Sequence, residues 1–115
     1  MEAVELEAQL RALLKPYEGK LERAQIYGID VLKRPGAKTH DWFAGVRPGK
    51  GTAKLMILPI KVHPELLEGI SLSLHKRQSG EALFTLRPGD DALIPELAEL
   101  LARAFAIYTN DPGGF

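Results

Sequence analysis

Two apolar segments, joined by a Pro-Gly-Lys-Gly stretch between Asp41 and Ile60, constrain the fold more than any other part of the sequence. A short loop rich in glycine and proline between two such segments is typical of a β-hairpin. A loop formed by residues 48–51 predicts these cross-strand neighbours: Val46 with Ala53, Ala44 with Leu55, and Trp42 with Ile57. All of them are apolar, so one face of the predicted hairpin should pack against a core.

The opposite face of this hairpin combines apolar and cationic residues. Because successive side chains of a strand point to opposite faces, it should carry Phe43, Gly45, Arg47, Lys54, Met56 and Leu58. We interpret this face as the working surface, with Phe43, Arg47, Lys54 and Met56 as candidate binding residues. Apolar groups beside cations suit a small anionic ligand, a protein partner or a second copy of the chain. The alternative is that residues 62–79 cover this face and that its role is structural.

The composition is that of one globular domain spanning residues 1–115, with 45% apolar and 26% charged residues. The absence of cysteine excludes disulfide bonds and thiolate chemistry. The N-terminal segment is acidic and lacks a long apolar stretch, so we expect no secretory signal, no membrane partner and a cytoplasmic location.

Basic and acidic residues are unevenly distributed, although the chain holds 15 of each. Residues 33–87 are rich in lysine and arginine, whereas the two ends of the chain carry a net negative charge. This pattern predicts a cationic sheet backed by acidic helices, which would attract an anionic ligand or partner. Lysines that protect exposed strands from aggregation would give the same pattern. The balanced total charge does not indicate a nucleic-acid partner.

Leucines at helical spacing predict an amphipathic helix near each end of the chain. The first should end near Lys15, because Pro16 disfavours helix continuation. The second should begin at Pro95, which suits a first helical position, and run to about Tyr108. A further short helix is expected over residues 64–69, with another turn through residues 72–74.

Two further strands complete the predicted sheet. Residues 20–33 alternate as one strand, kinked at Gly28, and residues 81–87 form the last strand. Strands joined by hairpins favour an antiparallel sheet, and two amphipathic helices need one apolar face to cover. The prediction is therefore an α+β two-layer sandwich, with a mainly antiparallel four-stranded sheet and the N- and C-terminal helices on one face.

The sequence carries no catalytic signature, so we predict no catalytic residues and no cofactor, and we favour a non-enzymatic role without excluding an enzyme whose site the fold would assemble. His40 beside Asp41 and His63 beside Glu65 would supply metal ligands only if the fold brought them together, and His75 stands apart.

The first helix holds an alternative set of metal ligands. Glu2, Glu5 and Glu18 offer carboxylate oxygens of the kind that hold hard cations. An exposed, solvated helix face is the simpler interpretation of these residues.

Several segments resemble a known family: QIYGIDV (residues 25–31), FAGVRPGKGTAKLMILPI (43–60), and SGEALFTL (79–86) followed by IPELAELLARAF (94–105). They resemble the YdhG-like proteins, a bacterial family of small domains largely without assigned function, whose fold is similar to that of frataxin. HPELLEGIS (63–71) and KRQSG (76–80) also look like a group of uncharacterised bacterial proteins. The resemblance covers about residues 24–108 and implies the fold more than a function.

Two functions are favoured at this point, and an enzyme is a third, weaker alternative that only a formed site would justify. The first is a non-enzymatic binding module that uses the exposed sheet face. The second, implied by the frataxin-like resemblance, is an iron-binding chaperone that uses the acidic residues of the first helix.

Overall fold

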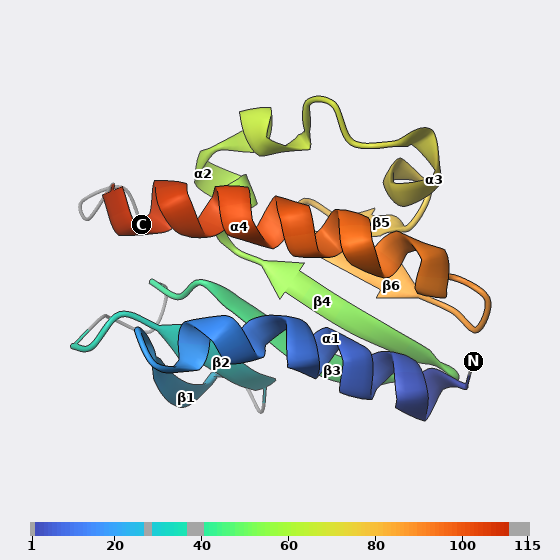
Figure 1. Ribbon diagram of the computed structural model, residues 1–115, viewed down its shortest axis with the longest axis horizontal. Coiled ribbons are helices and arrows are strands. Elements are labelled where there is room, and N and C mark those ends of the chain that lie inside the picture. Colours follow the sequence, from blue (N-terminus) through green and yellow to red (C-terminus); the bar gives the residue numbers. More distant parts are fainter. Residues whose placement is uncertain (1, 27–28, 37–40, 111–115) are drawn as a thin grey trace.

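Along the sequence, the described strands all lie between a first helix, α1, and a last helix, α4 (Figure 1). The computed structural model describes residues 2–26, 29–36 and 41–110. The described helices are α1 (Ala3–Glu18), α2 (Pro59–Val62), α3 (Leu72–His75) and α4 (Ile94–Asn110), with 3₁₀ turns η1 (Pro64–Leu67) and η2 (Asp91–Leu93). The described strands are β1 (Glu22–Ile26), β2 (Ile29–Lys33), β3 (Ala44–Gly49), β4 (Thr52–Ile57), β5 (Gln78–Gly80) and β6 (Leu83–Leu86).

The strands form one antiparallel sheet in the order β1-β2-β3-β4-β6-β5. The α+β class and the antiparallel pairing agree with the prediction, but the sheet has six strands rather than four. The segment expected to be one kinked strand is the hairpin β1–β2, with Ile26 paired to Ile29. The other added strand, β5, has three residues and lies at the edge beside β6.

Helices α1 and α4 lie side by side on one face of the sheet, as predicted (Figure 1). Leu10 of α1 and Leu101 of α4 are both fully buried in the core between the helices and the sheet. Pro16 does not end α1, which continues to Glu18 and places Tyr17 against this core.

The segment from α2 to α3 extends the helical side of the molecule. Its buried residues Leu66, Ile70 and Leu74 belong to the same core as α4, and α2 and η1 pack against α4. The predicted sandwich of four strands and two helices is therefore too simple, because two strands and this segment enlarge it.

The register of the central hairpin differs from the predicted one by two residues. Val46 pairs with Leu55 and Ala44 with Ile57, because the strands continue to the pair Gly49–Thr52 and only Lys50 and Gly51 form the turn. Gly51 has a φ of +70°, which a tight hairpin turn requires and glycine adopts without strain. A shift of two residues leaves each side chain on its original face, so the apolar face still packs against the helices.

The prediction for Trp42 and Phe43 is wrong, because these two residues lie on opposite faces from those expected. Phe43 is fully buried in the main core, beside Ala44, whereas Trp42 belongs to a second apolar cluster. Regular alternation begins only where β3 begins, at Ala44, so it does not extend back to residues 42 and 43.

Candidate functional site

A second apolar cluster lies on the sheet face that α1 and α4 leave uncovered. We call it the open-face cluster; its members are the buried Ile26, Val31 and Trp42 and the partly buried Ala24, Ile29, Met56 and Leu58. An antiparallel sheet with one covered face usually carries polar residues on the other. On this face apolar side chains extend from β1 to β4 beside charged residues at its edges, and the central ones, Ile26, Val31 and Trp42, are only 7%, 2% and 7% exposed.

Gly45 brings two strands of the open-face cluster close together. A Cβ atom at this position would lie 2.7 Å from Cγ1 of Val31 and 3.3 Å from Cγ2 of Ile29. The missing side chain of Gly45 therefore lets these two residues of β2 pack directly over β3.

Two cations flank the open-face cluster. Arg47 pairs directly with Lys54 across the hairpin, and Gly45 pairs with Met56 two residues further along. Alternation places Arg47, Lys54 and Met56 on this same face. Arg47 is exposed and Lys54 half-buried, and neither makes an ion pair with a described residue.

Three of the four candidate binding residues thus share one face, and Phe43 does not. Phe43 lies in the main core, with ring centroids 5.1 Å from Tyr17 and 5.4 Å from Phe105. The expected contact between Phe43 and Met56 is therefore wrong. Trp42, which the sequence pattern had assigned to the core, belongs with Met56 to the open-face cluster.

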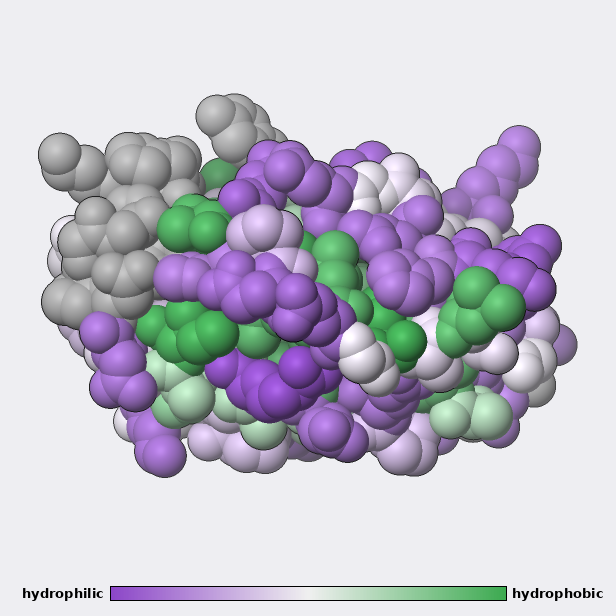
Figure 2. Space-filling view, turned by 90° about the horizontal axis from the view of Figure 1, so that it is seen from above, coloured by the Kyte–Doolittle hydropathy of each residue, from purple (hydrophilic) through white to green (hydrophobic). Residues whose placement is uncertain are grey.

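Residues 62–79 do not cover the open-face cluster, because their buried side chains join the main core beside α4. Figure 2 views the molecule from this α2–α3 side, where hydrophilic side chains interrupt the hydrophobic groups. Val62 and Leu72 are the large apolar residues exposed in this segment.

A cleft of about 350 Å³ opens on the helical side of the sheet, between α1 and the hairpin β1–β2. It exists because α1 packs mainly on β3 and β4 and leaves β1 and β2 uncovered. The apolar residues that line it come from α1, β2 and β3; they are Leu14, Val31, Leu32 and Val46, and all four are largely buried. The charged residues that line it are Arg11, Lys15, Glu18, Arg23 and Asp30.

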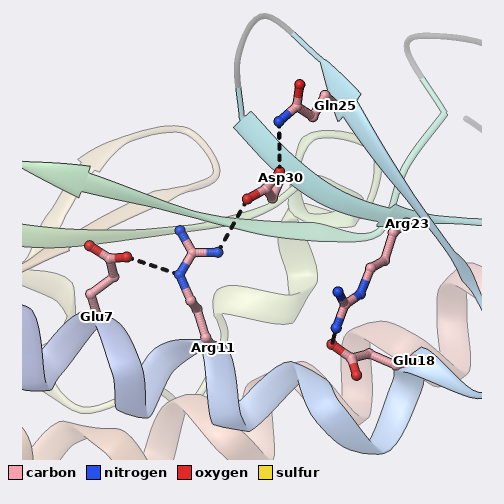
Figure 3. A network of polar contacts seen from close by, with 6 residues as sticks. All are labelled: Glu7, Arg11, Glu18, Arg23, Gln25 and Asp30. Carbon is pink, nitrogen blue, oxygen red and sulfur yellow. Dashed lines mark hydrogen bonds and ion pairs between the residues drawn. The ribbon is translucent and has the colours of Figure 1, made fainter.

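Ion pairs cross this cleft from α1 to the hairpin (Figure 3). The guanidinium of Arg11 donates to Glu7 at 2.9 Å and, across the cleft, to Asp30 at 3.5 Å. Arg23 donates back to Glu18 on α1 at 2.7 Å. The other carboxylate oxygen of Asp30 accepts a hydrogen bond of 3.1 Å from Gln25. These contacts tie α1 to β1 and β2, and the apolar residues of the cleft are largely buried.

The sequence pattern did not indicate this cleft. We predicted one strand over residues 20–33, in which Gln25 and Asp30 are far apart. In the structure these two residues are cross-strand neighbours of β1 and β2. Gly28 was the one sign in the sequence that this segment could form two strands instead of one.

The acidic residues of α1 do not form one metal site. Glu2 and Glu18 are separated by the length of the helix, about 24 Å at 1.5 Å per residue. Glu18 is also paired with Arg23. Among the described residues, no group of three or more histidine or acidic side chains could hold a metal ion.

Histidine and carboxylate do meet at one of the expected positions. Nδ1 of His63 lies 2.8 Å from Oε1 of Glu65. The backbone N–H of Glu65 and the His63 side chain lower the pKa of the Glu65 carboxyl group. His63 is the N-cap residue of η1, and Glu65 lies in its first turn. The other pair that the sequence suggested, His40 with Asp41, cannot be placed because His40 lies outside the described residues.

Comparison with known proteins gives no relative: no protein-family model, no curated protein and no solved structure matches the chain. None of the helices in the described part of the chain combines the length and the apolar character needed to cross a membrane.

Proposed function

We propose that this protein is a non-enzymatic binding module that docks an acidic protein partner on the open-face cluster, between Arg47 and Lys54 and the apolar side chains beside them. The observation that carries the proposal is the apolar character of a sheet face that no described helix covers. The cytoplasm is the proposed location, on the sequence grounds given above.

The shape of the surface favours a protein over a small ligand. Small molecules bind in concave pockets that bury most of their surface. A sheet face is broad, and protein interfaces combine an apolar centre with a polar rim. The open-face cluster has this arrangement: Ile26, Val31 and Trp42 are its buried members, and Met56 lies at its β4 edge, next to the pair Arg47 and Lys54.

The charges favour an acidic partner over a second copy of the chain. In β1 to β4, the strand register places a single carboxylate on this face, that of Glu22. Lys33 already engages this carboxylate at 3.0 Å. A second copy would therefore bring no free carboxylate from this face to Arg47 and Lys54.

We propose membership of the YdhG-like family on the basis of the sequence segments described above. The YdhG-like resemblance rests on the sequence segments alone and implies a fold similar to that of frataxin. We do not extend the proposal to iron binding, because the acidic residues of α1 are spread along the helix and partly paired.

A site-specific cross-linking experiment tests the docking surface. Met56→p-benzoylphenylalanine places a photoreactive group in the open-face cluster, and irradiation in cells should yield a discrete adduct with one acidic protein. The charge reversal R47E/K54E in the same background should suppress the adduct, because it replaces the attraction by repulsion.

The control reverses the same number of charges elsewhere. K61E/K76E changes two exposed lysines of the α2–α3 segment and should leave the adduct unchanged. Equal adduct yield in both double variants, or no adduct at position 56, would overturn the proposal. Thermal unfolding of each variant establishes that it is folded.

A further inference from the structure

The cleft between α1 and the β1–β2 hairpin lies on the opposite side of the sheet from the open-face cluster. Its apolar lining includes Leu14, Leu32 and Val46, all of which pack into the main core. Its volume of about 350 Å³ lies in the range of small-ligand pockets. Leu14, Leu32 and Val46 are 7%, 3% and 1% exposed, and Val31 also lines the cleft, so the apolar body of a small molecule would contact their edges together with the aliphatic parts of Arg11, Lys15 and Arg23.

The polar groups of the cleft are rich in hydrogen-bond donors. A guanidinium carries five N–H donors, and Arg23 uses one nitrogen on Glu18 while Arg11 uses two on Glu7 and Asp30. Lys15 also lines the cleft and makes no hydrogen bond or ion pair with a described residue. The cations thus retain free donors after their internal pairs are formed.

Three of the four carboxylate oxygens that line the cleft are engaged, and the other oxygen of Glu18 makes no described hydrogen bond. Both carboxylate oxygens of Asp30 accept hydrogen bonds, one from Arg11 and one from Gln25. Glu18 accepts from Arg23. Free donors and mostly engaged acceptors favour an anionic head group over a cationic one.

From this arrangement we infer that the cleft binds a small amphiphilic carboxylate, whose head group is held by Arg11, Arg23 and Lys15 and whose apolar body lies on Leu14, Leu32 and Val46. The head group binds the remaining N–H donors of Arg11 and Arg23 and the ammonium of Lys15, so the contacts of Arg11 with Glu7 and Asp30 stay in place. These contacts hold the guanidinium of Arg11 in position, and they keep the carboxylate of Asp30 paired beside the bound anion.

Octanoate is the test ligand, because it combines a carboxylate with an apolar chain. In a titration followed by amide NMR shifts, the changes should be confined to residues 11–18 of α1, to β1 and β2, and to Val46. Octanol and inorganic phosphate each supply only half of the recognition and should bind at least about tenfold more weakly. Octylammonium should bind no better than octanol.

Two variants separate the cleft from the rest of the surface. K15E removes a cation without breaking a described contact, and it should weaken octanoate binding by about tenfold or more. The matched control K61E changes an exposed lysine of α2 and should bind octanoate like the wild type. R47E/K54E should also leave octanoate binding unchanged, so this test is independent of the docking surface.

Three results would overturn the inference. One is equal affinity for octanoate and octylammonium, and another is wild-type affinity in K15E. The third is a set of shift changes centred on Trp42 and Met56, which would place the ligand on the open-face cluster.

Discussion

Phe43→Ala should be among the most destabilising substitutions in this chain. Phe43 is fully buried, and its ring centroid lies 5.1 Å, 5.4 Å and 5.8 Å from those of Tyr17, Phe105 and Tyr108. Truncation of a buried phenylalanine costs about 3–5 kcal/mol, and each aromatic pair adds about 0.5–1.5 kcal/mol beyond buried area. We therefore expect a loss of about 4–5 kcal/mol, or roughly 15–20 °C in Tm.

Urea unfolding followed by far-UV circular dichroism measures this loss. Phe43→Leu keeps most of the apolar volume and should lower the free energy of unfolding by about 1–1.5 kcal/mol. This variant tests the placement of Phe43 if Phe43→Ala does not fold. Arg47→Ala, on the open face, should change the free energy of unfolding by less than about 0.5 kcal/mol. A loss below about 1 kcal/mol in Phe43→Ala would refute the placement of Phe43 in the main core.

Two further substitutions test the sheet and its connection to α4. Gly45→Ala should destabilise the protein by about 1–3 kcal/mol in urea unfolding, because its Cβ atom would lie 2.7 Å from Cγ1 of Val31; an unchanged midpoint would contradict the close packing of β2 on β3. Asp90→Asn should cost about 1–2 kcal/mol at neutral pH, because it weakens the 2.6 Å hydrogen bond from Arg77. Burial raises the pKa of Asp90, but Arg77 and the backbone N–H of Arg87 outweigh it and hold that pKa below its ordinary value of 3.8. The stabilisation is therefore complete above pH 3.8 and disappears as the pH falls through the lower folded pKa, so the wild type and the variant should converge in acid; a constant difference would contradict the ionic contribution.

The elements that the sequence predicted best are those with a sustained period. Leu10 and Leu101 belong to long helical stripes, and both are buried as expected. The hairpin register was wrong by two residues, yet Val46 and Leu55 still lie on the predicted face, because side chains alternate with a period of two.

The predictions failed where a local sequence pattern ends and where the structure depends on contacts between residues distant in the sequence. Alternation was extended from β3 to Phe43, although the strand begins one residue later. The three residues of β5 carry no apolar pattern from which a strand could be recognised. The cleft lies between Arg11 and Asp30, which are 19 residues apart, and only the position of α1 over the sheet brings these two residues together.

Trp42 allows a direct test of the central claim, that the open-face cluster is a docking surface. It is the single tryptophan of the chain and belongs to that cluster, so its emission reports on that face. The acidic partner captured at position 56 should be purified and titrated into the wild-type protein while Trp42 fluorescence is recorded at low and at high salt. We predict a saturable change in emission whose apparent affinity falls as salt rises, because the attraction to Arg47 and Lys54 is screened. Binding of that partner with unchanged Trp42 emission, or with an affinity independent of salt, would contradict the claim.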